Sequence, residues 1–161
     1  MADLDWVRAG WAAARRPEHA DTARTIAFRP ERYGHAVAMT PTLLSDLAAT
    51  GAPIEICPTS NLRTLSLGSD YRRHPTIGHW LEAGHPIAIC TDDTSLFGIT
   101  LSDELARVGL AFGLSRRQLA ALALGALDAV FERRRGVVEG LRERMEAEVA
   151  AALGEPAVQR L

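Results

Sequence analysis

Two adjacent carboxylates, Asp92 and Asp93, follow a short apolar run in the segment PIAICTDDTSLFG (residues 86–98). An ionised carboxylate is costly to bury unless hydrogen bonds, an opposite charge or a metal ion compensates it. An aspartate can ligate a cation such as zinc, and a second one beside it can accept a hydrogen bond from a substrate nitrogen. The pair therefore predicts a metal or ligand site at the end of a buried strand.

Polar residues also follow two earlier apolar runs. His35 comes at the end of the first run, and Ser60 and Asn61 come at the end of the second. A histidine can act as a general base or bind a metal through a neutral nitrogen. Each group alone is better explained without chemistry, because such a histidine is more often structural and an Asp-Asp pair more often caps a helix. Their occurrence at successive strand ends favours one shared site.

The elements that would position these groups are three predicted strands, at residues 31–39, 53–60 and 85–92. The second and third are almost continuously apolar, which is typical of parallel strands covered on both faces. Helical patterns at residues 40–51 and 74–85 connect them, as expected for successive right-handed βα units. The first of these patterns opens with a predicted Thr40 cap followed by a proline in the first turn. The carboxyl ends of parallel strands share one edge of a sheet, and ligands gather there.

After the last predicted strand the pattern is helical. A segment at 100–113 carries a Ser102 cap, a segment at 114–132 opens at Ser115, and the charged segment 136–153 is expected to be a solvated outer helix. The chain is thus an α/β protein, either a small doubly wound domain or one sector of a larger barrel, and periodicity does not separate the two. No glycine-rich loop follows a strand, which disfavours a doubly wound phosphate binder.

The composition is that of a soluble globular protein, with 161 residues, 47% hydrophobic and 24% charged. The net charge of −2 gives no argument for nucleic acid or a membrane surface as partner. No secretory signal or membrane-length apolar run is expected, and residues 1–30 are predicted to form one or two helices broken at Pro17. Cys57 and Cys90 lie within apolar runs, which predicts buried free thiols and a cytoplasmic location.

Four strings resemble the C-terminal motifs of the adenosine/AMP deaminase family: RYGHA (32–36), EICPTSNLRT (55–64), HP (85–86) and ICTDDTSLFGITLSDEL (89–105). Members of that family are zinc-dependent (β/α)8 barrels, and these motifs mark the sixth, seventh and eighth strands. The resemblance implies that the chain is the C-terminal sector of such a TIM barrel, with three parallel strands and flanking helices, followed by C-terminal helices.

The resemblance covers residues ~18–132 of one expected domain (1–161), and residues 133–161 are expected to hold a C-terminal helix. The string HPIAICTDD (85–93) is most similar to the adenosine-deaminase-like subgroup, whose members act on N6-methyl-AMP. The implied partner is therefore a purine nucleoside or nucleoside monophosphate, and the implied reaction is hydrolysis at the 6-amino group of adenosine, AMP or N6-methyl-AMP.

The same resemblance implies three roles. His35 matches the active-site histidine that acts on the zinc-bound water, and Asp92 matches a carboxylate that ligates zinc. Asp93 matches the neighbour that contacts the purine ring. Zinc lowers the pKa of its bound water to about 7, so that hydroxide can attack C6 of the purine.

The chain also departs from the family pattern. It contains no His-x-His pair, and His19 lies only 16 residues before His35, too close to be the fifth-strand ligand. The segment VRAGWAAARRPE (7–18) lacks a histidine, and the proton-donating glutamate is not found. We therefore expect a truncated deaminase-type chain that binds zinc weakly and is inactive alone. The alternative is a non-catalytic half-barrel that associates with itself or with a complete relative through exposed sheet edges.

Overall fold

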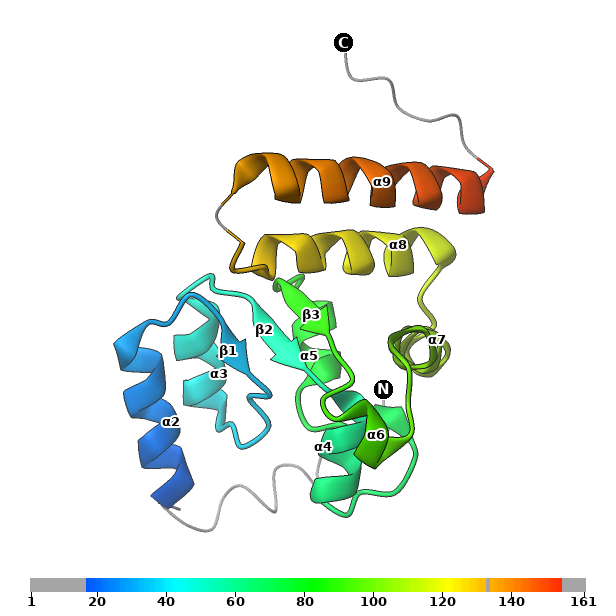
Figure 1. The fold of residues 1–161 in the computed structure, drawn as a ribbon. Coiled ribbons are helices and arrows are strands. Elements are labelled where there is room, and N and C mark those ends of the chain that lie inside the picture. Colours follow the sequence, from blue (N-terminus) through cyan, green and yellow to red (C-terminus); the bar gives the residue numbers. More distant parts are fainter. Residues whose placement is uncertain (1–16, 133, 155–161) are drawn as a thin grey trace.

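The computed structural model describes residues 17–132 and 134–154. Three strands form one parallel sheet in chain order, β1 (Tyr33–Gly34), β2 (Ile54–Ile56) and β3 (Ile87–Ile89) (Figure 1). Ile54 is the register partner of both Tyr33 on β1 and Ile87 on β3. The predicted order of three parallel strands is confirmed.

Each strand is shorter than its apolar run. β1 ends where His35 and Ala36 adopt left-handed backbone angles, with φ of 59° and 47°, which interrupts the extended conformation. β2 ends before Pro58, which opens a helix instead of continuing the strand. Proline fixes a helical φ and lacks an N–H, so it is well suited to the first turn of a helix.

The helix that Pro58 opens is α4 (Pro58–Thr64), which begins in a segment that we predicted as the end of a strand. That prediction was wrong. Residues 58–62 are all buried, and α4 packs against α7 (Leu101–Phe112) and the short helix η1 (Tyr71–Arg73). Burial against these later elements stabilises a seven-residue helix that a local pattern does not indicate.

Helices α2 (Pro17–Phe28), α3 (Pro41–Ala48) and α5 (Ile77–Glu82) lie beside and behind the sheet (Figure 1). As predicted, Thr40 caps α3, where its side chain accepts a 3.2 Å hydrogen bond from the Leu43 N–H. The predicted helix at 74–85 begins only at Ile77. Hydrophobic residues that are 1% exposed or less form the centre of the core: Met39, Leu47, Ile54, Ile56, Cys57, Leu62, Ile77, Trp80 and Val108.

Two helices follow β3, a short one and a longer one. Helix α6 (Thr94–Phe97) begins directly after Asp93. Helix α7 is capped by Thr100. The predicted cap, Ser102, was wrong. Thr100 and Asp103 form a reciprocal capping box, which satisfies two backbone donors at the helix start, and Ser102 lies inside the first turn.

Helix α8 (Arg116–Gly125) begins after its predicted cap, Ser115, and packs against β3. It ends earlier than the predicted residue 132 and continues as the tighter helix η2 (Ala126–Ala129). Helix α9 (Arg135–Leu153) runs antiparallel along α8 (Figure 1), and the Arg142 guanidinium bonds Asp128 of η2 at 2.6 Å.

No helix within the described ranges is long and apolar enough to cross a membrane. Of the helices expected in residues 1–30, the structure describes α2, which begins at Pro17, and residues 1–16 lie outside the described part.

Candidate active site at the carboxyl edge of the sheet

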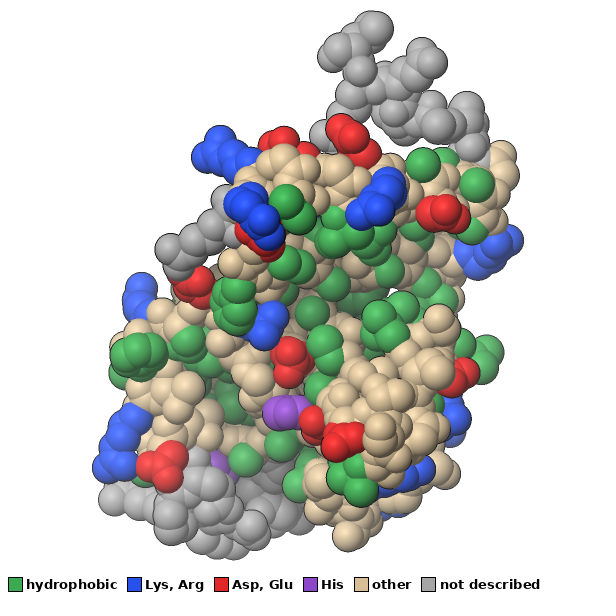
Figure 2. Space-filling view, viewed as in Figure 1, with side chains coloured by type: hydrophobic (Ala, Val, Ile, Leu, Met, Phe, Trp, Pro, Cys, Tyr) green, Lys and Arg blue, Asp and Glu red, His purple; other side chains and the backbone are tan. Residues whose placement is uncertain are grey.

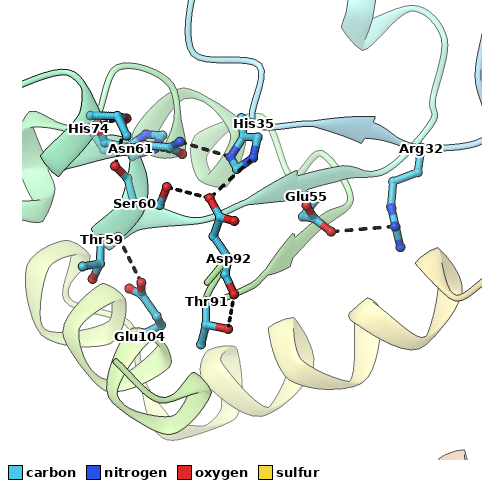
Figure 3. Close-up of polar contacts among 11 residues, drawn as sticks. Arg32, His35, Glu55, Thr59, Ser60, Asn61, His74, Thr91, Asp92 and Glu104 are labelled. Carbon is cyan, nitrogen blue, oxygen red and sulfur yellow. Dashed lines mark hydrogen bonds and ion pairs between the residues drawn. The ribbon is translucent and has the colours of Figure 1, made fainter. Parts of the chain in front are cut away.

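His35 follows β1 and Asp92 follows β3, and their side chains point toward each other across the carboxyl edge of the sheet (Figure 3). Nε2 of His35 lies 4.0 Å from Oδ2 of Asp92. The same carboxylate oxygen accepts a 2.7 Å hydrogen bond from the Ser60 hydroxyl at the start of α4. The polar residues that end three strands therefore meet at one site.

The two facing side chains are only partly buried, with 38% of His35 and 40% of Asp92 exposed. The Asp92 carboxylate thus keeps much of its hydration, and the hydrogen bond from Ser60 offsets part of the cost of desolvating its charge. In the space-filling view a histidine with acidic side chains beside it lies near the middle of the visible face (Figure 2). The site is open to a ligand.

Strained backbone accompanies this pair. His35 and Asp92 have φ of 59° and 58°, in the left-handed region that costs a non-glycine residue about 1–2 kcal/mol. Strain of this kind is concentrated at functional sites, where the surrounding structure holds it. Here the Ala36 and His35 N–H groups donate to the carbonyls of Gly34 and Glu55, both at 2.8 Å, which fixes the turn after β1.

A chain of hydrogen bonds extends from His35 into the protein. Nδ1 of His35 lies 3.1 Å from Nδ2 of Asn61, and Oδ1 of Asn61 lies 3.0 Å from Nε2 of His74. Nδ1 of His74 accepts from the backbone N–H groups of Thr76 and Ile77 at 3.3 and 3.2 Å. From the sequence alone we placed His74 at a helix start and gave Asn61 no role, because only the fold of α4 connects them.

Burial and, to a smaller degree, the neighbouring His35 lower the pKa of His74 to about 4. Its side chain is nearly inaccessible to water, at 5% exposed. His74 is therefore a neutral imidazole at physiological pH, and both of its nitrogens are used inside the protein.

Asp93 lies next to Asp92, but its side chain caps a helix. Its Oδ1 accepts a 2.9 Å hydrogen bond from the Leu96 N–H, so that the side chain caps α6. The residue is exposed. A contact with a purine ring stays a prediction for Asp93.

Three side chains could donate to a metal ion at this edge. The ligand atoms of His35, Cys57 and Asp92 lie within 4.8 Å of one another. Cys57 is a free thiol, 1% exposed, and burial, with the nearby Glu55 carboxylate, raises its pKa to about 12. A protonated thiol is a poor zinc ligand, and a zinc site needs at least three good protein donors. The described residues therefore do not fit a complete zinc centre.

The adenosine deaminase family model matches residues 21–144. This chain belongs to the adenosine deaminase family. The predicted resemblance is confirmed, and the three parallel strands with their flanking helices are a partial barrel of this family.

Named relatives of this deaminase-family chain include an N6-mAMP deaminase of Arabidopsis thaliana, 36% identical over 115 residues, which are 71% of this chain and 32% of that protein. An aminodeoxyfutalosine deaminase of Streptomyces coelicolor is 40% identical over 108 residues, 66% of this chain and 27% of that protein. The crystal structure of Arabidopsis ADAL complexed with IMP aligns with a TM-score of 0.76 and 31% identity, over 86% of this chain and 39% of that one. The chain thus spans well under half of each relative.

One further residue supports the deaminase-type site without reaching its surface. Glu104 on α7 is fully buried, and its carboxylate accepts a 3.0 Å hydrogen bond from the Thr59 N–H (Figure 3). The same carboxylate accepts a 2.7 Å hydrogen bond from the Tyr71 hydroxyl. The first turn of α4, which carries Ser60, is thereby tied to α7 and η1. In the sequence Glu104 looks like an ordinary first-turn acidic residue, so its burial carried no signal there.

Proposed function

We propose that this chain supplies the carboxyl-terminal rim of the active site of a zinc-dependent deaminase-type hydrolase. The observation that carries the proposal is the 4.0 Å approach of His35 Nε2 to Asp92 Oδ2 at the ligand-binding edge of a deaminase-family sheet. The substrate would be a purine with a 6-amino or N6-methylamino group, as in adenosine, AMP or N6-methyl-AMP. The similarity to an Arabidopsis N6-mAMP deaminase and to the Arabidopsis ADAL structure complexed with IMP supports a nucleoside monophosphate as the substrate.

Each of three residues has a proposed role. Asp92 would contribute one carboxylate oxygen to the zinc centre of a complete barrel. His35 would hold or move a proton at Nε2, the nitrogen that faces Asp92, and a positioned group that transfers a proton to or from the reacting atoms contributes about 10²–10⁴-fold to rate. Asp93 would accept a hydrogen bond from a purine nitrogen while its other oxygen continues to cap α6.

We propose further that the chain does not catalyse deamination by itself. Catalysis needs all reacting groups on one rigid frame, and the sequence offers no His-x-His pair to complete a zinc centre around Asp92. A complementary half-barrel would supply those groups. The two outer strands of the sheet, β1 and β3, offer edges at which this chain could pair with itself or with a complete relative.

A chimera tests the first proposal directly. The matching segment of the Arabidopsis N6-mAMP deaminase is replaced by residues 21–144 of this chain, and release of ammonia or methylamine is measured with adenosine, AMP, N6-methyl-AMP and aminodeoxyfutalosine. We expect turnover of a 6-aminopurine that His35→Ala and Asp92→Ala abolish and that Ser45→Ala, an exposed position on α3, leaves unchanged. A folded, zinc-loaded chimera without turnover of any of these substrates would contradict the proposal.

The isolated chain tests the second proposal, that this chain does not catalyse deamination by itself. We expect elemental analysis to find well under one equivalent of zinc and the assay to find no deamination. One equivalent of zinc together with turnover that Asp92→Ala abolishes would overturn it. Size-exclusion chromatography with light scattering tests edge pairing, which a stable monomer contradicts.

A further inference from the structure

The hydrogen-bond chain that joins His74, Asn61 and His35 has a direction that the donors and acceptors determine. It begins at the backbone N–H groups of Thr76 and Ile77, which can only donate, and both lie within hydrogen-bond distance of Nδ1 of His74. Nδ1 must therefore accept and carries no proton. The single proton of this neutral imidazole is on Nε2.

Asn61 connects His74 to His35, and its orientation follows from the tautomer of His74. Because Nε2–H of His74 is a donor, the atom of Asn61 that lies 3.0 Å from it has to be the carbonyl oxygen Oδ1. The amide NH2 group is then turned toward His35 and donates to Nδ1 at 3.1 Å. Asn61 is only 4% exposed, so solvent does not compete for either bond.

The last step concerns His35 itself. A nitrogen that accepts from Asn61 cannot carry the proton of a neutral imidazole, so that proton is on Nε2, which faces Oδ2 of Asp92 at 4.0 Å. We infer that His74 and Asn61 are positioning residues that hold His35 in its Nε2–H tautomer, with the N–H directed at the rim where Asp92 lies.

The geometry also opposes protonation of His74, at the buried end of the hydrogen-bond chain. A charged His74 would carry a second proton on Nδ1, in direct opposition to the Thr76 and Ile77 N–H groups. The low pKa of His74, about 4, agrees with this conflict. The orientation of Asn61 is therefore kept over the ordinary pH range of a cell.

The consequence for chemistry rests on the proposed function. If His35 acts on the attacking water, the nitrogen that faces the site must be the one whose protonation state is controlled, and a histidine held in the wrong tautomer loses most of its catalytic effect. His74 and Asn61 would then influence kcat without touching the substrate.

The direct test is the tautomer of His35 in the whole chain, measured by long-range ¹H–¹⁵N NMR of the imidazole rings at about pH 8, above the usual histidine pKa of about 6.5. We expect a pyridine-type Nδ1 and a pyrrole-type Nε2 for both His35 and His74. Asn61→Asp presents a carboxylate oxygen where the amide donor was, and we expect Nδ1 of His35 to become protonated. His79→Gln, at an exposed position on α5, should leave the His35 signals unchanged.

A pyrrole-type Nδ1 of His35 in the unaltered chain overturns the inference, and this result does not depend on whether any variant folds. An Asn61→Asp chain that folds but keeps the original His35 signals overturns it too. In the chimera described above, Asn61→Asp should lower kcat by about 10²-fold with little change in KM. If the NMR result holds and the chimera is inactive with every substrate, the tautomer assignment stands and the proposed function fails.

Discussion

The Ser60 hydroxyl donates a 2.7 Å hydrogen bond to Oδ2 of Asp92, the same oxygen that lies 4.0 Å from Nε2 of His35. Ser60 is 3% exposed, whereas the Asp92 side chain is 40% exposed. A buried residue on α4 therefore fixes the position of a solvent-accessible carboxylate. This relationship makes the rigidity of α4 part of the candidate site.

Ser60→Ala should lower the rate of purine deamination by the chimera about tenfold. Hydrogen bonds to charged groups are worth about 1.5–3 kcal/mol, and the partial exposure of Asp92 places the effect near the lower end of this range. The measurement is kcat/KM for N6-methyl-AMP, with Ser45→Ala as the matched control on the exposed surface of α3. Equal rates for the two variants would show that Ser60 does not hold Asp92.

Buried His74 should make the folded protein less stable in acid. Its folded pKa of about 4 lies below the ordinary value of 6.5, so between these two pH values the unfolded chain binds more protons than the folded one. The contribution of His74 is therefore fully present above pH 6.5 and is lost as the pH falls toward 4, by about 3 kcal/mol in total.

The pH effect is measured as the difference in unfolding free energy between the unaltered chain and His74→Gln, from urea titrations at several pH values. That difference removes the contribution of the carboxylates, which titrate in the same range. His79→Gln, which replaces an exposed histidine of α5, should give a curve parallel to that of the unaltered chain. If the His74→Gln curve is parallel as well, the acid sensitivity does not come from His74.

The sequence predicted the parallel strand order and the meeting of His35 with Asp92, because both follow from almost continuous apolar runs and from the geometry of βα units. It also predicted the caps at Thr40 and Ser115, which depend on residues a few positions away. These features are local, or follow from topology.

The features that the sequence did not predict depend on contacts between distant residues. Helix α4 needs the buried bond between Thr59 and Glu104, 45 positions apart, and the tautomer chain needs His74 to reach Asn61 across 13 positions. The cap of α7 was misplaced because Thr100 and Ser102 are both good capping residues, and the choice between them depends on Asp103, which reaches back to the Thr100 N–H.

Glu104 should be important for stability even though it lies outside the carboxyl edge. Glu104→Ala leaves the Thr59 N–H and the Tyr71 hydroxyl without their buried acceptor, and we expect a loss of about 3 kcal/mol in unfolding free energy. Glu104→Gln keeps one acceptor oxygen and should cost less. Glu82→Ala, at an exposed position of α5, is the control and should change stability by less than about 0.5 kcal/mol. Urea denaturation measures all three, and a Glu104→Ala chain as stable as the control would refute the role.

The residues that follow α2 and α3 should respond to substitution in opposite directions. Arg29 follows α2 and is exposed with φ of 53°, a conformation that suits glycine, so Arg29→Gly should stabilise the fold by up to about 1 kcal/mol. Gly51 follows α3 with φ of 68°, and a Cβ there would meet no atom within 4 Å. Gly51→Ala should therefore destabilise by about 1 kcal/mol through backbone strain alone, without a steric clash. Thermal unfolding of both variants measures the two signs, and a destabilised Arg29→Gly chain would mean that the Arg29 side chain contributes more than its backbone strain costs.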